Sequence, residues 1–374
     1  MNKKELLIIS DPISAESVQL RFLNNIITKL SDRFSVYVYT TYIEPDARVS
    51  VKGAEIIGRQ RRFVPYSLYK HLFGSNEGVL WAYSWFLQFL FKRNTSDIKK
   101  NCSNEKYSHI LNIAQTIPAN CDMYWGQSVP LDHTLIGMRP STPILKLIPS
   151  FLIKFIGRID RKFIKSISKM GKVVVTNSYY TKSIYESLGV HVHSVIYSVP
   201  DLFSFKPSPI NNEEKYVLAY IGKESEIDTI LDVARKGVRV VTFGAKIPAG
   251  SQIEELKRAT VFKGYVSKDE LISLYSHAVF TLFPFTHEPF GYVPLESISC
   301  GTPVLTYMKQ GPAETVMDGV SGWLTKSKDE LVGKALEIWN FKQKMVISED
   351  IQNAARNFAK FGSDQEIAAL LIAS

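Results

Sequence analysis

The feature that most constrains the fold is an alternation of short apolar runs with helix-like segments on both sides of one polar stretch. That stretch, Lys206–Glu214, carries two prolines and is a linker candidate. Apolar runs before and after it lie at Leu6–Ser10, Ser35–Thr40, His109–Ala114, Lys172–Ser178, Tyr216–Gly222, Val238–Gly244, Thr260–Val266, Val279–Phe285 and Thr302–Tyr307. Because strand–helix–strand order is typical of parallel sheets, we predict an α/β chain of two doubly wound, Rossmann-like domains.

The linker divides the chain into a predicted first domain, residues 1–205, and a predicted second domain, residues 206–374. Residues from Lys328 onward have helical patterns, and a return of the last helix onto the first domain is left open. Ligands of such sheets bind outside the carboxyl ends of the strands. The cleft between the two domains is therefore the expected site.

Composition excludes several classes of protein. A chain of 374 residues with 45% hydrophobic and 22% charged residues is globular rather than disordered or fibrous. Its three cysteines, Cys102, Cys121 and Cys300, form no CxxC pair, so we expect no zinc site, no disulfide framework and a reducing, cytoplasmic setting. The longest apolar stretch, Val79–Phe91, is shorter than the ~20 residues of a membrane-spanning helix. The first apolar run is too short for the core of a signal peptide.

The most informative stretch is Phe283–Tyr307, where an apolar strand is followed by a loop and a helix. The loop carries Glu288, and the predicted helix begins near Gly291 and carries Glu296. Amides of the first helical turn have no partner within the helix, and together with the helix dipole they bind anions. We therefore predict a phosphate site at the amides of Gly291–Val293, flanked by the two glutamates. From the residues alone, a turn and a helix with two surface glutamates is an equally good interpretation.

The nine residues EPFGYVPLE resemble the E-x(7)-E motif of glycosyltransferase family 4, whose members have the GT-B fold. Similar resemblances flank the motif, in SISCGTPV, in QGPAETVMDGVSGWL and in FKGYVSKDELISLYSHAVFTLFP. Near the end of the first domain, VVVTNSYYTKSIYESLGV and HSVIYSVPD resemble family segments as well. The resemblance covers residues 172–325 well and the rest of the chain only by architecture.

The resemblance implies a retaining hexosyltransferase that uses a UDP- or GDP-sugar as its donor and needs no metal ion or other cofactor. Glu288 matches the acid that contacts the donor sugar and is expected to be catalytic, and Glu296 matches the acid that holds the donor ribose. The other donor-binding positions implied are those near the diphosphate and sugar, Phe290, Gly291, Tyr292 and Val293, and those near the nucleobase, Tyr265 and Val266. For Val266, the end of a strand is nearly as good an interpretation.

Two parts of the sequence depart from the family pattern. Lys223 matches a basic residue that stabilises the charge of the leaving phosphate, but the second basic residue is missing and the stretch ESEID stands in its place. The open substitutes are Lys309, Arg235 and Lys246, or a leaving group of lower charge. The loop after the first strand lacks the usual Gly-Gly turn, so the weak candidates for the first domain's share of the site are Ser10, Ser14, His109 and His133.

The segment Ile144–Lys172 carries eight basic residues and one acidic residue, with apolar residues at helical spacing. Basic amphipathic helices of this kind lie on anionic membranes, and we expect an interruption near Gly157. The predicted membrane-surface residues are Lys154, Phe155, Arg158, Arg161, Lys162 and Lys165. Arg59–Arg62 and Trp81–Arg93 form a second basic and aromatic patch.

These patches favour a glycan or lipid-linked acceptor and a peripheral position on the cytoplasmic face of a membrane. Packing of the helix on the first sheet, with its charges solvated, is an equally good interpretation. A sugar phosphate as a soluble acceptor stays open. A sequence pI of about 9.2 also suits nucleic acid, for which the sequence contains no known motif, so this alternative is weaker.

Overall fold

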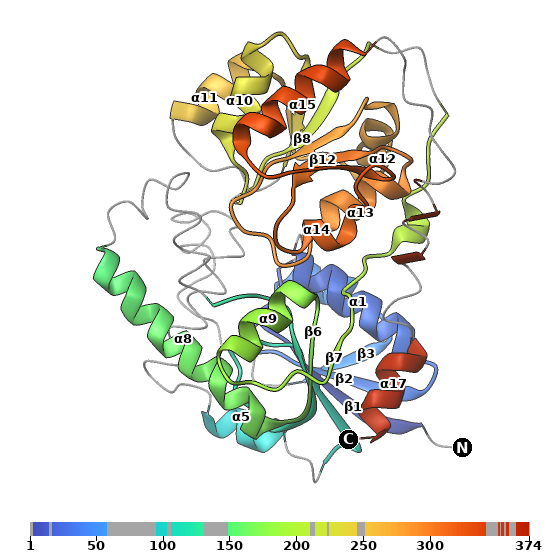
Figure 1. Ribbon diagram of the computed structural model, residues 1–374. Coiled ribbons are helices and arrows are strands. Elements are labelled where there is room, and N and C mark those ends of the chain that lie inside the picture. Colours follow the sequence, from blue (N-terminus) through green and yellow to red (C-terminus); the bar gives the residue numbers. More distant parts are fainter. Residues whose placement is uncertain are drawn as a thin grey trace.

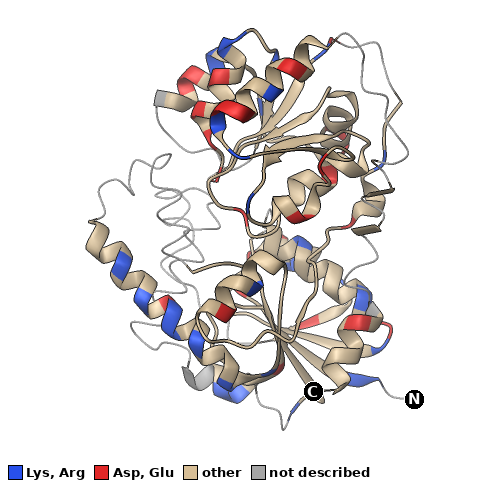
Figure 2. Cartoon of the chain, viewed as in Figure 1, with Lys and Arg blue, Asp and Glu red and all other residues tan. Residues whose placement is uncertain are grey.

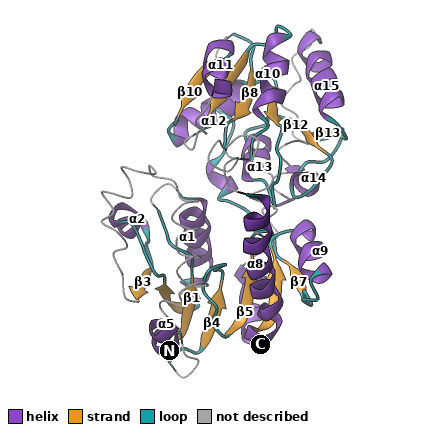
Figure 3. Ribbon diagram, turned by 90° about the vertical axis from the view of Figure 1, so that its left-hand side faces the viewer, coloured by secondary structure: helices purple, strands orange, loops and turns teal. Residues whose placement is uncertain are grey.

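The computed structural model describes residues 3–14, 17–57, 95–102, 106–130, 149–209, 214–222, 224–244 and 251–341, and parts of 351–373. These residues form two parallel β-sheets, one below the other in Figure 1. Helices lie on both sides of the strands, as Figure 3 shows from the side. The α/β expectation is therefore confirmed, while the division at residue 205 stays a prediction.

The first sheet has the strand order β3-β2-β1-β4-β5-β6-β7, with all described neighbours parallel. Its strands are β1 (Lys4–Ile9), β2 (Phe34–Tyr39), β3 (Ala54–Ile57), β4 (His109–Asn112), β5 (Cys121–Gly126), β6 (Gly171–Thr176) and β7 (Ser194–Val195). Its helices are α1 (Val18–Leu30), α2 (Pro45–Ser50), α5 (Thr95–Asn101), α8 (Ser150–Met170) and α9 (Tyr179–Ser187), and the short 3₁₀ helix η1 (Leu202–Ser204) follows.

The second sheet has the order β10-β9-β8-β11-β12-β13 and is also parallel. Its strands are β8 (Val217–Tyr220), β9 (Val240–Phe243), β10 (Val261–Gly264), β11 (Thr281–Phe283), β12 (Val304–Tyr307) and β13 (Gly322–Thr325). Its helices are α10 (Ile227–Arg235), α11 (Ser251–Ala259), α12 (Lys268–His277), α13 (Tyr292–Ser299), α14 (Pro312–Thr315) and α15 (Lys328–Asn340). The helices α13 and α14 lie at the end of this domain that faces the first (Figure 1).

Both sheets are buried on their two faces, which explains their nearly continuous apolar strands. In β1, Leu6 and Ile8 belong to one core and Leu7 and Ile9 to another, on the opposite face. The last helix, α17 (Asp364–Ala373), adds Ile367, Ala368 and Leu371 to the first of these cores, where α1 also packs. The end of the chain thus lies in the first domain, beside its beginning.

Two sequence expectations need correction. The helix α8 is continuous through Gly157, which is buried within it, because one glycine costs only about 1 kcal/mol in a long helix. Four strands, β3, β5, β7 and β13, went unrecognised. The strand β5 is buried along its whole length but contains an aspartate, Asp122, whose carboxylate accepts the Ile110 amide at 2.7 Å.

Among the described helices, none is both long and apolar enough to cross a bilayer.

Candidate functional site

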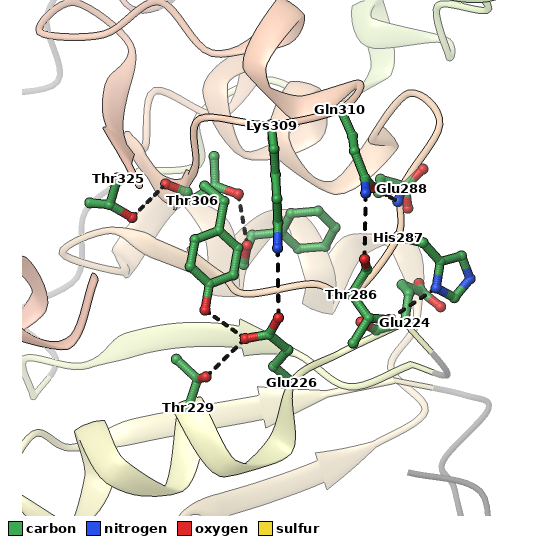
Figure 4. A network of polar contacts seen from close by, with 12 residues as sticks. Glu224, Glu226, Thr229, Thr286, His287, Glu288, Thr306, Lys309, Gln310 and Thr325 are labelled. Atoms are coloured by element: carbon green, nitrogen blue, oxygen red, sulfur yellow. Dashed lines mark hydrogen bonds and ion pairs between the residues drawn. The ribbon is translucent and has the colours of Figure 1, made fainter. Parts of the chain in front are cut away.

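The carboxyl ends of the adjacent strands β8, β11 and β12 meet at one edge of the second sheet and carry a network of polar side chains (Figure 4). Glu226 follows β8, the loop with Glu288 follows β11, and Lys309 and Gln310 follow β12. This is the edge at which doubly wound sheets bind ligands. The sequence-predicted acids therefore lie where the topology places a site.

The loop that carries Glu288 is held at several points. Thr286 donates its amide to the carbonyl of Glu224 at 2.7 Å. The Glu288 amide donates to Gln310 Oε1 at 2.6 Å, and the Gly311 amide donates to the Glu288 carbonyl at 3.0 Å. Gln310 has a positive φ of 58°, which is uncommon for a residue other than glycine. A strained residue thus holds the acid's backbone in place.

The Glu288 carboxylate folds back onto its own loop. Its Oε1 accepts the amides of Phe290 at 3.2 Å and Gly291 at 3.1 Å. Gly291 precedes α13 with a φ of 97°, a conformation that glycine adopts without strain. The expectation that the Gly291 amide is free is therefore wrong, because the nearby carboxylate binds it. The amides without a partner inside the helix begin at Tyr292 and Val293.

Burial and the neighbouring charge of Glu224 raise the pKa of Glu288 to about 8. The two amide bonds oppose this rise, but they are the smaller causes. Both amides bond the same oxygen, so the other oxygen can carry the proton. Next to it, burial lowers the pKa of His287 to about 4. At neutral pH this loop is therefore largely uncharged.

Glu296, the second acid, is buried at the boundary between the two domains. Its Oε1 lies 3.0 Å from Arg21 Nη1, on α1 of the first domain, and its Oε2 accepts the Tyr275 hydroxyl at 3.3 Å. Burial raises the pKa of Glu296, while the charge and hydrogen bond of Arg21 and the bond from Tyr275 lower it. The Arg21 guanidinium also lies 5.5 Å from the centre of the Tyr292 ring.

Other contacts join the same two surfaces. Glu314, on α14, accepts the amides of Tyr179 at 2.9 Å and Tyr180 at 2.7 Å, which begin α9 of the first domain. The Tyr197 hydroxyl donates to Glu314 at 3.2 Å, and its ring stacks on Phe290 with a centroid distance of 5.7 Å. Glu314 thus caps a helix of the opposite domain, and the two predicted acids lie beside this contact surface.

Of the lysines and arginines considered as diphosphate-binding cations, one lies at the edge of the site and another lies away from it. Lys309 lies at the site edge, 3.9 Å from Glu226 and over the Tyr307 ring. Glu226 also accepts the Tyr307 hydroxyl at 2.5 Å and the Thr229 hydroxyl at 3.1 Å. Arg235 instead pairs with Asp232 and Glu255 on the exposed helices α10 and α11. Lys223 and Lys246 lie outside the described residues.

The nucleobase candidates follow β10 at the same edge of the sheet. Tyr265 is exposed, and Val266 packs against the core cluster that contains Tyr275. Val266 thus contributes to packing, as the strand-end interpretation expects, and its contact with the nucleobase stays a prediction.

The weak candidates of the first domain fall at opposite ends of its sheet. Ser10 and Ser14 follow β1 at the carboxyl edge and are buried, and Ser10 accepts the Gln19 side-chain amide at 3.1 Å. His109 begins β4, which is parallel to β1, so it lies at the amino edge, and burial lowers its pKa. We therefore leave His109 out of the site. His133 lies outside the described residues.

The residues that sequence reasoning missed are Arg21, Tyr275, Gln310 and Glu314. Arg21 stands 275 positions from Glu296, and no local pattern links two residues so far apart. In the described part of the chain, no group of three or more His, Cys, Asp or Glu side chains is arranged to hold a metal ion.

Comparisons with known proteins indicate a family. The family model described as "Glycosyl transferases group 1" matches residues 205–358. A glycogen synthase of Mycobacterium tuberculosis is 30% identical over 131 residues, which are 35% of this chain and 26% of that protein. A D-inositol 3-phosphate glycosyltransferase of Acidothermus cellulolyticus is 35% identical over 107 residues, 25% of this chain and 23% of that protein. The matches thus span about a quarter of the length of these relatives.

Solved structures resemble the whole chain. HepE of Anabaena in complex with UDP has a TM-score of 0.65 and 17% identity, covering 99% of this chain and 100% of that one. WaaG, a glycosyltransferase involved in lipopolysaccharide biosynthesis, has a TM-score of 0.69 and 14% identity, with coverages of 99% and 100%. At these identities the likeness concerns the fold alone.

Proposed function

We propose that the chain, which matches the group 1 glycosyl transferases over residues 205–358 and has the GT-B fold, is a retaining, metal-independent hexosyltransferase. Its donor in this proposal is a UDP- or GDP-sugar and its acceptor a glycan or lipid-linked sugar. The observation that carries the proposal is the pair Glu288 and Glu296, on either side of the first turn of α13 at the boundary between the domains.

In the proposed mechanism each acid has a separate task. Glu296 accepts hydrogen bonds from the donor ribose, while the amides of Tyr292 and Val293, together with Lys223, bind the diphosphate. Glu288 binds the donor sugar. As a neutral carboxyl at pH 7 it can both donate a hydrogen bond to the sugar and accept one from it.

The transfer step breaks the bond between the sugar C1 and the phosphate oxygen, and its electron pair stays on the leaving nucleoside diphosphate. The acceptor oxygen forms the new bond to C1 on the same face, and its proton passes to the departing phosphate oxygen. Stabilisation of the growing phosphate charge is then the main task of the protein, and a single well-placed donor can contribute ~3–4 kcal/mol. No separate general base is needed.

A thermal-shift panel of UDP-, GDP- and ADP-sugars tests the proposal. At a concentration of 100 Kd, the cognate donor should add about 2.7 kcal/mol to the free energy of unfolding. Anomeric NMR of the product tests retention, and activity in excess chelator tests metal independence. Absence of a shift with every nucleotide sugar contradicts the proposal.

The helix α8 supports the membrane part of the proposal. Ile164 and Ile167 are buried in a core of the first domain, as the sheet-packing interpretation expects. Near its start, however, Phe151 is 73% exposed and Phe155 48% exposed. The basic residues of α8 appear as blue segments along the helix in Figure 2. An exposed apolar tip flanked by cations has the chemistry of an interfacial helix.

We infer that this tip docks on an anionic membrane surface together with the exposed basic residues that follow it along α8, Lys154, Arg158, Lys162 and Lys165. Arg161, also among the six predicted residues, is only partly exposed. Each basic residue near such a surface contributes about 1 kcal/mol. Wild-type protein should sediment with anionic vesicles, and Phe151→Ser/Phe155→Ser protein should do so less. Equal sedimentation of both proteins, or activity on a soluble sugar phosphate that is indifferent to vesicles, contradicts the inference. Binding of the basic surface to nucleic acid in competition with vesicles favours the weaker alternative.

A further inference from the structure

The side chain of Arg21 reaches from the first domain to the predicted ribose acid of the second. Its Nη1 lies 3.0 Å from Glu296 Oε1, and this pair joins α1 to α13 across the domain boundary. The glutamate side chain is 3% exposed, whereas the arginine side chain is 50% exposed. The acid is thus enclosed, and the arginine side chain beside it is half-exposed.

The sequence of α1 explains why Arg21 takes this position. Ser17 caps the helix by accepting the Leu20 amide at 2.9 Å, which fixes its first turn. Arg21 and Asn25 are one turn apart and therefore share a face. Asn25 donates its side-chain amide to the carbonyl of Val199, in the segment that leads to the second domain, at 2.6 Å. This face of α1 is directed toward the domain boundary.

The charge balance at the site calls for another cation. A diphosphate needs cationic partners, but Glu224 and Glu226 occupy the stretch where the resemblance led us to expect a second basic residue. Lys309 is close to Glu226, and Arg235 is engaged with Asp232 and Glu255. Among the described cations, Arg21 is the one that contacts a member of the acid pair.

Arginine can bind two anionic groups at once. Its planar guanidinium presents five N–H donors in a fixed fork. In the described part of the chain, the Arg21 guanidinium donates a hydrogen bond to Glu296 through Nη1. The guanidinium also lies 5.5 Å from the ring centre of Tyr292, the first residue of α13. It therefore contacts the predicted ribose acid and lies beside the side chain of Tyr292, a residue whose amide is a predicted diphosphate donor.

We propose that Arg21 is a donor-binding residue supplied by the first domain: it binds the diphosphate of the nucleotide sugar while it holds Glu296. The proposal rests on the proposed function, because it deepens the account of the same site. It makes the donor a bridge between the two domains, and it supplies the cation that the sequence lacks after Lys223.

The test compares Arg21→Gln, Arg21→Lys and Glu296→Gln with wild type, using calorimetric binding of UDP and GDP and of the corresponding nucleosides uridine and guanosine. Arg258→Gln, at an exposed position near the end of α11, is the matched control for loss of an arginine charge. We expect Arg21→Gln to weaken binding of the nucleoside diphosphate roughly 10- to 100-fold, the range for a charge-assisted hydrogen bond. Binding of the nucleoside should change much less, Arg21→Lys should recover part of the loss, and the control should bind like wild type.

A purely structural role for Arg21 predicts a different pattern of binding. If Arg21 only positions Glu296, then Arg21→Gln and Glu296→Gln weaken nucleoside and nucleoside diphosphate by the same factor, and the proposal is overturned. Unchanged binding in Arg21→Gln overturns it as well. If wild type binds none of the nucleotides, the proposed function itself fails. If wild type binds them and only the variants behave contrary to expectation, the Arg21 proposal alone fails.

Discussion

Replacement of Glu288 by glutamine should remove a pH dependence of folding stability. Glutamine has the same shape, and its Oε1 can still accept the amides of Phe290 and Gly291, which lie 3.2 and 3.1 Å from the carboxylate oxygen. The substitution therefore removes a titrating group while it keeps the local hydrogen bonds. Any difference between variant and wild type that grows with pH reports on the proton of Glu288.

The expected magnitude follows from the raised pKa of Glu288, about 8 against 4.5 for a free side chain. Below pH 4.5 the carboxyl is protonated in both the folded and the unfolded protein and has no effect. Between pH 4.5 and 8 the folded protein keeps a proton that the unfolded protein has lost. Stability therefore falls as the pH rises, by about 1.4 kcal/mol per pH unit. Above pH 8 the loss is complete.

The assay is urea unfolding of wild type and Glu288→Gln at pH 5.5, 6.5 and 7.5. The variant should gain about 3 kcal/mol relative to wild type between pH 5.5 and 7.5, because wild type loses that contribution over two pH units. Glu254→Gln, at an exposed position of α11 where Lys257 lowers the pKa of the acid, is the control. It should follow the wild-type pH profile. If the free energies of Glu288→Gln and wild type change in parallel, then Glu288 is ionised at neutral pH and the reasoning is refuted.

Four further predictions concern the loops around the site and the helix α15. Gln310→Ala should be less stable than Gln310→Gly by about 1 kcal/mol, since its φ of 58° strains any residue with a Cβ, and chemical denaturation measures the difference. Glu314→Gln weakens the cap on α9 and should speed hydrogen exchange of the Tyr179 and Tyr180 amides, whereas unchanged exchange would contradict the cap. Gly311→Ala places a Cβ 2.4 Å from the Phe290 backbone and should cost about 1–3 kcal/mol in thermal unfolding. Gly333→Ala, in open space on α15, should instead stabilise by about 0.5–1 kcal/mol.

Local patterns predicted much of the fold. The apolar runs at Leu6–Ser10 and Val238–Gly244 correspond to β1 and β9, because buried parallel strands are nearly continuous in apolar residues. The strand β5 escaped recognition because Asp122 interrupts its apolar character, although Ile110 and Lys172 satisfy that carboxylate. An ion pair between distant residues cannot be seen in one strand's sequence.

The site was predictable only in part, for a similar reason. The spacing of Glu288 and Glu296 placed both acids around α13, since that relation is local. The attachment of Glu288 to the Gly291 amide depends on the conformation of a loop, which the sequence pattern did not specify. The contact of Arg21 with Glu296 depends on how two domains meet, and no periodicity within either domain carries that information.

The position of α17 has a consequence for how this protein can be divided. Since Ile367 and Leu371 fill the core beside α1, the polypeptide passes between its two halves twice, once outward and once on its return. A fragment that starts at residue 206 would contain α17 without the core against which it packs. A chain that ends before residue 364 would lack the α17 side chains that fill the core of the first domain. Two segments of the chain thus connect the halves, and we expect neither half to fold on its own as a separate fragment.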